Sequence, residues 1–134
     1  MLTYGIALLV VVVVFQILKY SIRRKRPVVR PESKRLTSRL TKAEHGTFSM
    51  PSGDASCVGL FCFLYTAMMG IPTTYIIMPL VMAGRVFYQC HWWGDTLCGV
   101  VIGTVVGTIV FTQFEAWAPL ARLICGEGTF IPEF

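Results

Sequence analysis

Three long stretches without a charged residue decide what this chain can fold into. They cover residues 1–18, 55–84 and 96–114. As an α-helix, the first would extend about 27 Å at about 1.5 Å per residue, which is close to the thickness of a bilayer core. Hydrophobic residues make up 54% of the sequence and the mean hydropathy is +0.64, values too high for an ordinary soluble domain. The chain therefore belongs to the membrane class.

The first stretch predicts a membrane helix at about residues 2–20. A cleaved signal peptide is the alternative, since it also contains an apolar run near the start of a chain. In this sequence the positive charges follow the apolar run instead of preceding it, and no small-x-small cleavage site comes after it. We therefore expect this helix to be retained.

The middle stretch is too long for one membrane helix. Its 30 residues would reach about 45 Å as a single helix, more than the hydrocarbon thickness. Gly70 suits a helix C-cap, and Pro72 cannot continue a helix. The sequence therefore predicts a membrane hairpin with helices at about 52–69 and 73–90.

The last stretch predicts a fourth membrane helix, at about residues 96–116. Gly99, Gly103 and Gly107 follow one another at intervals of four residues. This stripe of small residues favours close packing against another helix. The general tolerance of membrane helices for glycine is the alternative explanation.

Together these stretches predict an all-α fold, a transmembrane helical bundle of about four membrane helices that forms one domain over residues 1–134. Four crossings place the basic loop 21–50 and the turn 90–95 on the same side of an integral, multi-pass membrane protein. The five cysteines show no C-x-x-C spacing and are typical of core positions, so they predict no metal site.

Positive charge is concentrated in one part of the chain. Ten of the twelve Lys and Arg residues fall within residues 19–42, and no aromatic residue lies between Arg23 and Lys42. A basic segment beside a bilayer attracts anionic headgroups, whereas a nucleic-acid interface would interleave aromatics with the charges. We expect membrane lipids and not nucleic acid as partners. The positive-inside rule places this segment in the cytoplasm and both termini outside.

The first polar cluster lies where the first helix ends. Lys19 and Arg26 are seven residues apart, which is two helical turns or about 10 Å along the axis. Pro27 disfavours helix at Arg26, so the chain can turn back there. Two cations can then converge on one phosphate. Ordinary flanking charge of a membrane helix is the alternative.

The second cluster, Pro51-Ser52-Gly53-Asp54, opens the second helix. The free backbone N–H groups of a helix N-terminus bind anions, Gly53 allows close approach, and Ser52 adds a hydroxyl. This pattern predicts an anion cradle. A plain N-cap is the alternative, because serine and aspartate are common at helix starts.

The third cluster contains Arg85, His91 and Asp95. The histidine and the aspartate are four residues apart, so on a helix they would share a face. The carboxylate can then hold the imidazole in one tautomer while its other nitrogen attacks a substrate. A histidine that merely packs at the membrane interface is the alternative. All three clusters fall on one side of the membrane, where gathered ionisable groups are usually functional.

In order and spacing, the three clusters resemble the tripartite signature of the type 2 phosphatidic acid phosphatase and vanadium haloperoxidase superfamily, Lys-x6-Arg-Pro, Pro-Ser-Gly-His and Ser-Arg-x5-His-x3-Asp. The resemblance spans residues 19–95. It implies that the phosphate oxygens are held by five residues, Lys19, Arg26, Ser52, Gly53 and Arg85. It also implies that His91 is the nucleophile, forming a phosphohistidine, and that Asp95 orients it. No metal or other cofactor is needed, because the cations stabilise the transition-state charge.

The chain departs from this signature at two positions. Gly84 stands where the family usually has serine, and Asp54 stands where it has its first histidine. That histidine is the general acid of the family, so Asp54 is the third catalytic candidate. An aspartate at a helix N-terminus should be ionised near neutral pH. His45, in the basic loop, is the one other side chain that can supply a proton near pH 7, although a solvated loop histidine is the simpler reading.

The missing acid bears on the substrate. An alcohol leaving group with a pKa of about 16 needs a proton, whereas a phosphate leaving group with a second pKa of about 6 hardly does. This favours a lipid diphosphate, such as a prenyl diphosphate, over a monophosphate. Many relatives have six membrane helices, whereas this chain has four, and the resemblance often implies a lumenal or extracellular site.

The sequence thus predicts a metal-independent membrane phosphatase that hydrolyses a lipid phosphate or diphosphate through a phosphohistidine. A degenerate relative that binds lipid phosphates or a membrane partner without turnover is the main alternative, since the first histidine is lost. A haloperoxidase shares the same site residues, but membrane helices argue against it.

Overall fold

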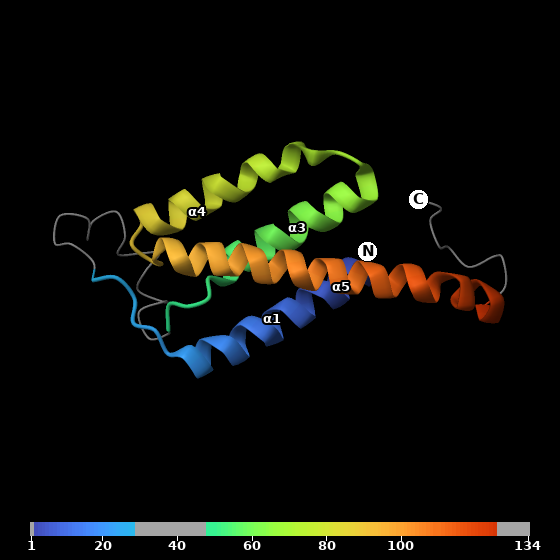
Figure 1. Cartoon of the computed structure of the whole chain (residues 1–134), viewed down its shortest axis with the longest axis horizontal. Coiled ribbons are helices and arrows are strands. Elements are labelled where there is room, and N and C mark those ends of the chain that lie inside the picture. Colours follow the sequence, from blue (N-terminus) through green and yellow to red (C-terminus); the bar gives the residue numbers. More distant parts are fainter. Residues whose placement is uncertain (1, 29–47, 126–134) are drawn as a thin grey trace.

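The structure of the protein is a computed structural model that describes residues 2–28 and 48–125, with side chains at 4–28 and 48–116. The expectation for His45 lies outside these residues. The regular structure of the described part is helical, which confirms the all-α fold (Figure 1). Its elements are α1 (Leu2–Ile22), α3 (Gly53–Met69), the 3₁₀-helix η2 (Pro72–Ile76), α4 (Ile77–Phe87) and α5 (Trp93–Cys125).

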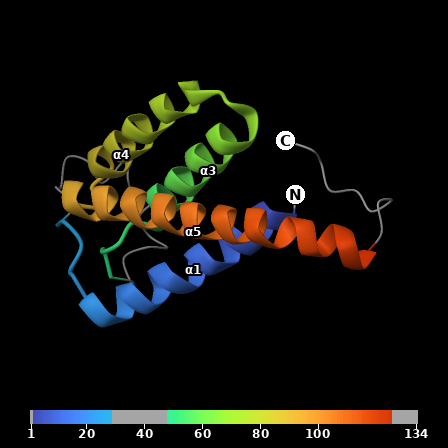
Figure 2. The ribbon, with the colours of Figure 1, turned by 45° about the vertical axis from the view of Figure 1, so that its right-hand side comes forward.

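Helices α3 and α5 form the centre of the bundle, and they share its most extensive contact. Helix α1 packs against both on one side, and α4 packs against both on the other (Figures 1 and 2). The core consists of small and aliphatic side chains from α1, α3 and α5, namely Ala7, Val11, Leu60, Leu64 and Val106. Helix α4 buries none of its residues completely, so it lies at the edge of the bundle.

Within the part of the chain that the structure describes, two helices are long and apolar enough to cross a membrane, over Tyr4–Ile22 and Trp93–Ala116. Their outer faces carry large exposed hydrophobic side chains, among them Leu9, Val13 and Ile17 on α1 and Leu97, Val101, Val105 and Ile109 on α5. A helix that is apolar on its outer face as well as its inner face is typical of a lipid environment. The structure thus shows the helical bundle that the uncharged stretches predict.

The predicted turn of the hairpin is confirmed. Gly70 ends α3 in the left-handed conformation, with φ of 68°, and its N–H donates to the carbonyl of Thr66 at 2.9 Å. Glycine adopts this conformation without steric cost, which explains why the helix ends there. Pro72 then begins η2.

The last two predicted helices have different bounds in the structure. The second arm of the hairpin ends at Phe87 instead of residue 90, because Gln89 adopts a φ of 55° that no α-helix allows. Helix α5 begins earlier than expected, at Trp93, and continues to Cys125. Absence of charge marks the membrane-level part of a helix, but a helix continues wherever its backbone hydrogen bonds continue.

The glycine stripe of α5 lies directly against the backbone of α3. A Cβ atom at Gly99 would lie 2.5 Å from the carbonyl oxygen of Ser52, and one at Gly103 would overlap the carbonyl oxygen of Ser56. Gly59 on α3 meets the carbonyl oxygen of Val100 in the same way, at 2.5 Å. Close helix packing, and not mere tolerance of glycine, therefore explains these residues.

Gly103→Ala should destabilise the bundle. The added methyl group would meet backbone atoms of Ser56 and Leu60, which cannot move aside as a side chain can. Overpacking of this kind costs about 1–3 kcal/mol, so we expect a lower melting temperature of the protein in detergent. Gly5→Ala is the matched control, because a Cβ atom there meets nothing within 4 Å. Equal melting temperatures for the two variants would contradict the close contact.

Candidate active site

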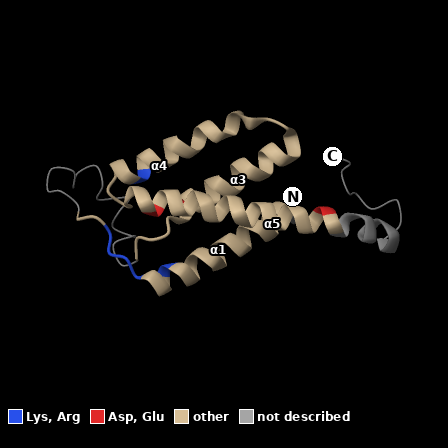
Figure 3. Cartoon of the chain, viewed as in Figure 1, with Lys and Arg blue, Asp and Glu red and all other residues tan. Residues whose placement is uncertain are grey.

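The charged residues of the described part gather mainly at one end of the bundle. Figure 3 shows positive charge at the end of α1, in the segment after it and on α4, with negative charge at the start of α5. Lys19 and Arg85 lie in the last turns of α1 and α4, and Asp54 and Asp95 lie in the first turns of α3 and α5. The fold thus brings parts of all three predicted clusters to the same end of the helices.

His91 lies just before α5 and is only 3% exposed. Its Nδ1 is 2.6 Å from the main-chain carbonyl oxygen of Ser49. Because a carbonyl oxygen can only accept a hydrogen bond, Nδ1 must carry the proton, and in the neutral ring Nε2 then holds a lone pair. This second nitrogen lies 3.4 Å from Nη1 of Arg26. The unprotonated nitrogen of the imidazole therefore faces a cation.

Arg26 is fixed beside His91 by the chain itself. Its Nη1 donates to the carbonyl oxygen of Cys90 at 2.8 Å, one residue before the histidine. A guanidinium carries five N–H donors, so it can hold a main-chain carbonyl and an anion at the same time. An anion bound by Arg26 would lie next to Nε2 of His91. The structure thus brings one residue of the first cluster beside one of the third.

Asp95 is completely buried and receives three hydrogen bonds. Its Oδ2 accepts from the hydroxyl of Ser49 at 2.6 Å and from the N–H of Trp92 at 3.0 Å. Its Oδ1 accepts from Nη1 of Arg24 at 2.9 Å. The negative charge is thus balanced by one cation and fixed by two neutral donors, as a buried carboxylate requires.

The expectation that Asp95 holds the imidazole directly differs from the structure. Nδ1 of His91 is 4.0 Å from Oδ2 of Asp95, whereas the carbonyl of Ser49 lies at 2.6 Å. Residues four apart share a face only within a helix, and α5 begins at Trp93, two residues after the histidine. The carboxylate therefore lies near the ring, but the loop provides its hydrogen-bond acceptor.

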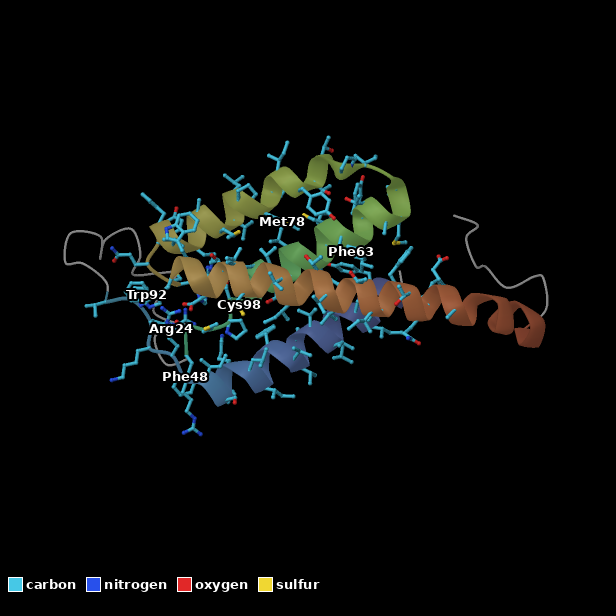
Figure 4. The ribbon with its side chains drawn as sticks, viewed as in Figure 1. Arg24, Phe48, Phe63, Met78, Trp92 and Cys98 are labelled. Carbon is cyan, nitrogen blue, oxygen red and sulfur yellow. The ribbon has the colours of Figure 1, made fainter. Side chains whose placement is uncertain are left out.

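Two residues of the site were not predicted from the sequence, Arg24 and Ser49. Arg24 stood among the flanking charges of the first helix, and its guanidinium also lies over the ring of Trp92, 5.7 Å from the ring centroid (Figure 4). Ser49 precedes the second cluster and belongs to none of the spacings. Its position two residues before Pro51 is the only signal that the sequence offers for it.

Arg85 and Asp54 form an ion pair across the α4 and α3 helices. Nε of Arg85 is 2.9 Å from Oδ2 of Asp54, and the two side chains are 19% and 59% exposed. The carbonyl oxygen of Arg85 accepts the N–H of His91 at 3.3 Å, which ties the arginine to the histidine through the main chain. The candidate acid is thus paired with a candidate phosphate ligand.

Comparison with models of known protein families identifies the family of the chain. The model of the PAP2 superfamily matches residues 1–119 of the chain. The chain belongs to the PAP2 superfamily. This membership supports a phosphatase-type activity on phosphoric esters. The comparison with curated proteins found no match, and neither did the comparison with solved structures.

The residues of the second cluster lie at the start of α3. Ser52 is buried and caps the helix, its Oγ accepting the N–H of Ala55 at 3.5 Å. Its own N–H donates to the carbonyl of Asp95 at 3.0 Å, which joins the second cluster to the third. Gly53 packs against the ring of Phe15, where a Cβ atom would lie 3.2 Å from the ring. The plain N-cap function of Ser52 is therefore present.

Lys19 of the PAP2 signature lies over the same aromatic ring. Its Nζ is 5.6 Å from the centroid of Phe15, a cation–π distance, and that ring covers Gly53. The ammonium group is thus held on the side of α1 that meets the start of α3. Among the described side chains, no three His, Cys, Asp or Glu residues lie close enough together to hold a metal ion.

Proposed function

We propose that this PAP2 protein is a metal-independent phosphatase that spans the membrane with four helices and hydrolyses a lipid phosphate or diphosphate. The observation that supports this most directly is the state of His91. Its Nδ1 donates to Ser49 at 2.6 Å, and its Nε2 faces Arg26 at 3.4 Å. A phosphate bound to Arg26 would lie beside this lone pair, and a nucleophile next to an anion-binding cation is the arrangement that attack on a phosphoryl group needs.

In the first step, Nε2 of His91 attacks the terminal phosphorus of the substrate. The N–P bond forms as the bond from phosphorus to the leaving oxygen breaks, and that oxygen departs with the electron pair. The imidazole becomes positively charged, with its proton still on Nδ1. The carbonyl of Ser49 and the carboxylate of Asp95, at 2.6 Å and 4.0 Å from Nδ1, stabilise that charge.

In the second step, water attacks the phosphohistidine and releases inorganic phosphate, which returns His91 to its starting state. Arg26 and Arg85 neutralise the phosphoryl oxygens in both steps, with Lys19 and the first turn of α3 as further ligands. These cations carry out the charge stabilisation that a divalent metal provides in other phosphotransfer enzymes. No metal or organic cofactor takes part in this scheme.

The substrate is a lipid whose headgroup reaches the charged end of the bundle. The outer faces of α1 and α5 are apolar, so a lipid tail can lie against them while its phosphate meets the cations. The chain lacks the family's first histidine, which would protonate the leaving oxygen, and Asp54 in its place is paired with Arg85. We therefore propose a diphosphate, whose lipid monophosphate product leaves without protonation, as the better substrate.

Turnover of a panel of lipid phosphates by the purified protein tests this proposal. We expect release of inorganic phosphate from lipid diphosphates, and slower release from phosphatidic acid and other monophosphates. Orthovanadate should inhibit, because it adopts the trigonal bipyramidal geometry of the transition state. EDTA should leave the rate unchanged.

Three results would overturn parts of the proposal. Loss of activity on chelation would show a metal site. Tight binding of lipid phosphates without phosphate release would show a degenerate relative instead of an enzyme. Equal rates on monophosphates and diphosphates would remove the proposed substrate preference while leaving the phosphatase itself.

A further inference from the structure

Ser49 links the segment after α1 to the third cluster of the site. Its N–H donates to the carbonyl of Arg24 at 2.8 Å, next to the first cluster. Its hydroxyl donates to Oδ2 of Asp95 at 2.6 Å, and its carbonyl accepts from Nδ1 of His91 at 2.6 Å. The residue is completely buried. Each of its three polar groups is therefore used, and each is used by a different segment of the chain.

The carbonyl of Ser49 can fix the imidazole only if the loop before α3 is itself held in place. Residues 48–52 belong to no helix or strand and lead directly into the first turn of α3. The bond from the Ser49 hydroxyl to Asp95 ties this loop to the rigid start of α5. A second tie, from the N–H of Ser52 to the carbonyl of Asp95 at 3.0 Å, runs in parallel. Asp95 therefore anchors the loop that holds the histidine.

We propose that Ser49 is a positioning residue through which Asp95 sets the tautomer and the orientation of His91. The catalytic consequence of this inference rests on the proposed function. The contacts that support the inference are independent of that function. The carboxylate acts on the nucleophile chiefly through the Ser49 hydroxyl and main chain, since it lies 4.0 Å from Nδ1 itself. Asp95 thus has a loop-holding task besides its effect on the charge of the ring.

Arg24 binds the carboxylate of Asp95 from the more exposed side. Its Nη1 is 2.9 Å from Oδ1 of Asp95, and its side chain is 43% exposed. The main-chain carbonyl of Arg24 also accepts a hydrogen bond from the N–H of Ser49. Arg24 therefore binds both the serine and the aspartate that the Ser49 hydroxyl connects. The guanidinium holds the buried carboxylate in a fixed orientation. Arg24 is therefore a second positioning residue, which acts through the carboxylate of Asp95.

The tautomer of His91 tests this inference without any substrate. The chain has two histidines, so ¹⁵N-histidine labelling of the His45→Gln protein leaves a single imidazole to observe. At pH 8, where an ordinary imidazole is neutral, we expect one tautomer with its proton on Nδ1. In Ser49→Ala the loop loses its tie to Asp95, and we expect a mixture of both tautomers. Ser49→Thr keeps a hydroxyl and should restore the single tautomer.

Kinetics of the same variants test the catalytic consequence. A small displacement of a catalytic group costs up to about 100-fold, so Ser49→Ala should lower kcat by about 10- to 100-fold with little change in KM. Asp95→Asn should lower kcat further. The double variant should be no slower than Asp95→Asn alone, because both substitutions break the same connection. Ser56→Ala is the matched control, because Ser56 is a buried serine of α3 whose hydroxyl donates to the main-chain carbonyl of Ser52 at 2.9 Å.

Several outcomes would overturn the inference. A single Nδ1–H tautomer in Ser49→Ala, or effects of the two substitutions on kcat that multiply, would show that Asp95 acts without the serine. If Ser49→Ala does not fold, Arg24→Gln removes an exposed partner of the same carboxylate, and an unchanged tautomer in that variant would overturn the inference equally. If the protein itself hydrolyses no lipid phosphate, the proposed function fails, and the tautomer measurement still decides the role of Ser49.

Discussion

His91→Ala is expected to abolish phosphate release from every lipid substrate, lowering kcat by about 10⁴-fold or more, as removal of a nucleophile does in other enzymes that form covalent intermediates. The structure gives the reason. The lone pair on Nε2 faces Arg26 at 3.4 Å, and the proton on Nδ1 is held by the loop at 2.6 Å. Alanine removes the attacking atom and leaves the cations in place.

The covalent intermediate provides a second readout for the same variant. A phosphohistidine is stable in alkali and hydrolyses in acid, so protein quenched in alkali during turnover of ³²P-labelled lipid diphosphate should carry label. We expect no label on His91→Ala. Retained turnover in this variant, with the melting temperature of the parent protein, would exclude His91 as the nucleophile. Loss of turnover with label still on the protein would place the intermediate on another residue.

The helices of this protein could be predicted from where charge is absent. Membrane-level segments exclude charged side chains, so residues 1–18 and 96–114 mark α1 and α5 with little ambiguity. Gly70 and Pro72 mark the hairpin turn, because their backbone preferences are local properties. The end of α4 was less predictable. It depends on the φ of Gln89, a residue whose type does not require that conformation.

Individual residues of the site could be predicted from the sequence, but the hydrogen bonds that connect them could not. The three clusters, taken together with the family resemblance, single out Arg26, His91 and Asp95, and the structure brings these residues to one end of the bundle. Arg24 and Ser49 escaped because their contacts join segments that are far apart in the sequence. The direct bond expected from Asp95 to His91 assumed one continuous helix. Helix α5 begins two residues after His91, so the histidine lies in the loop and its Nδ1 bonds a loop carbonyl instead.

Asp54→His is expected to raise the hydrolysis of lipid monophosphates by a factor within the roughly 10² to 10⁴ that general acid catalysis provides. An alcohol leaving group needs a proton, and an imidazole is the side chain best able to give one near pH 7. Asp54 is 59% exposed, so the larger side chain has room. The substitution also removes the carboxylate that pairs with Arg85 at 2.9 Å, which leaves the guanidinium to the phosphate.

Asp54→Asn separates these two effects, because it removes the negative charge without adding a proton donor. We expect it to leave kcat for diphosphates nearly unchanged and to give monophosphates no acid catalysis. If Asp54→Asn and Asp54→His raise monophosphate hydrolysis equally, release of Arg85 explains the gain and the imidazole does not act as an acid. If His45→Ala stops monophosphate turnover in the parent protein while Asp54→Asn does not, the proton comes from the loop before α3. The preference for a diphosphate would then lose its physical basis, because an acid would be present for both kinds of substrate.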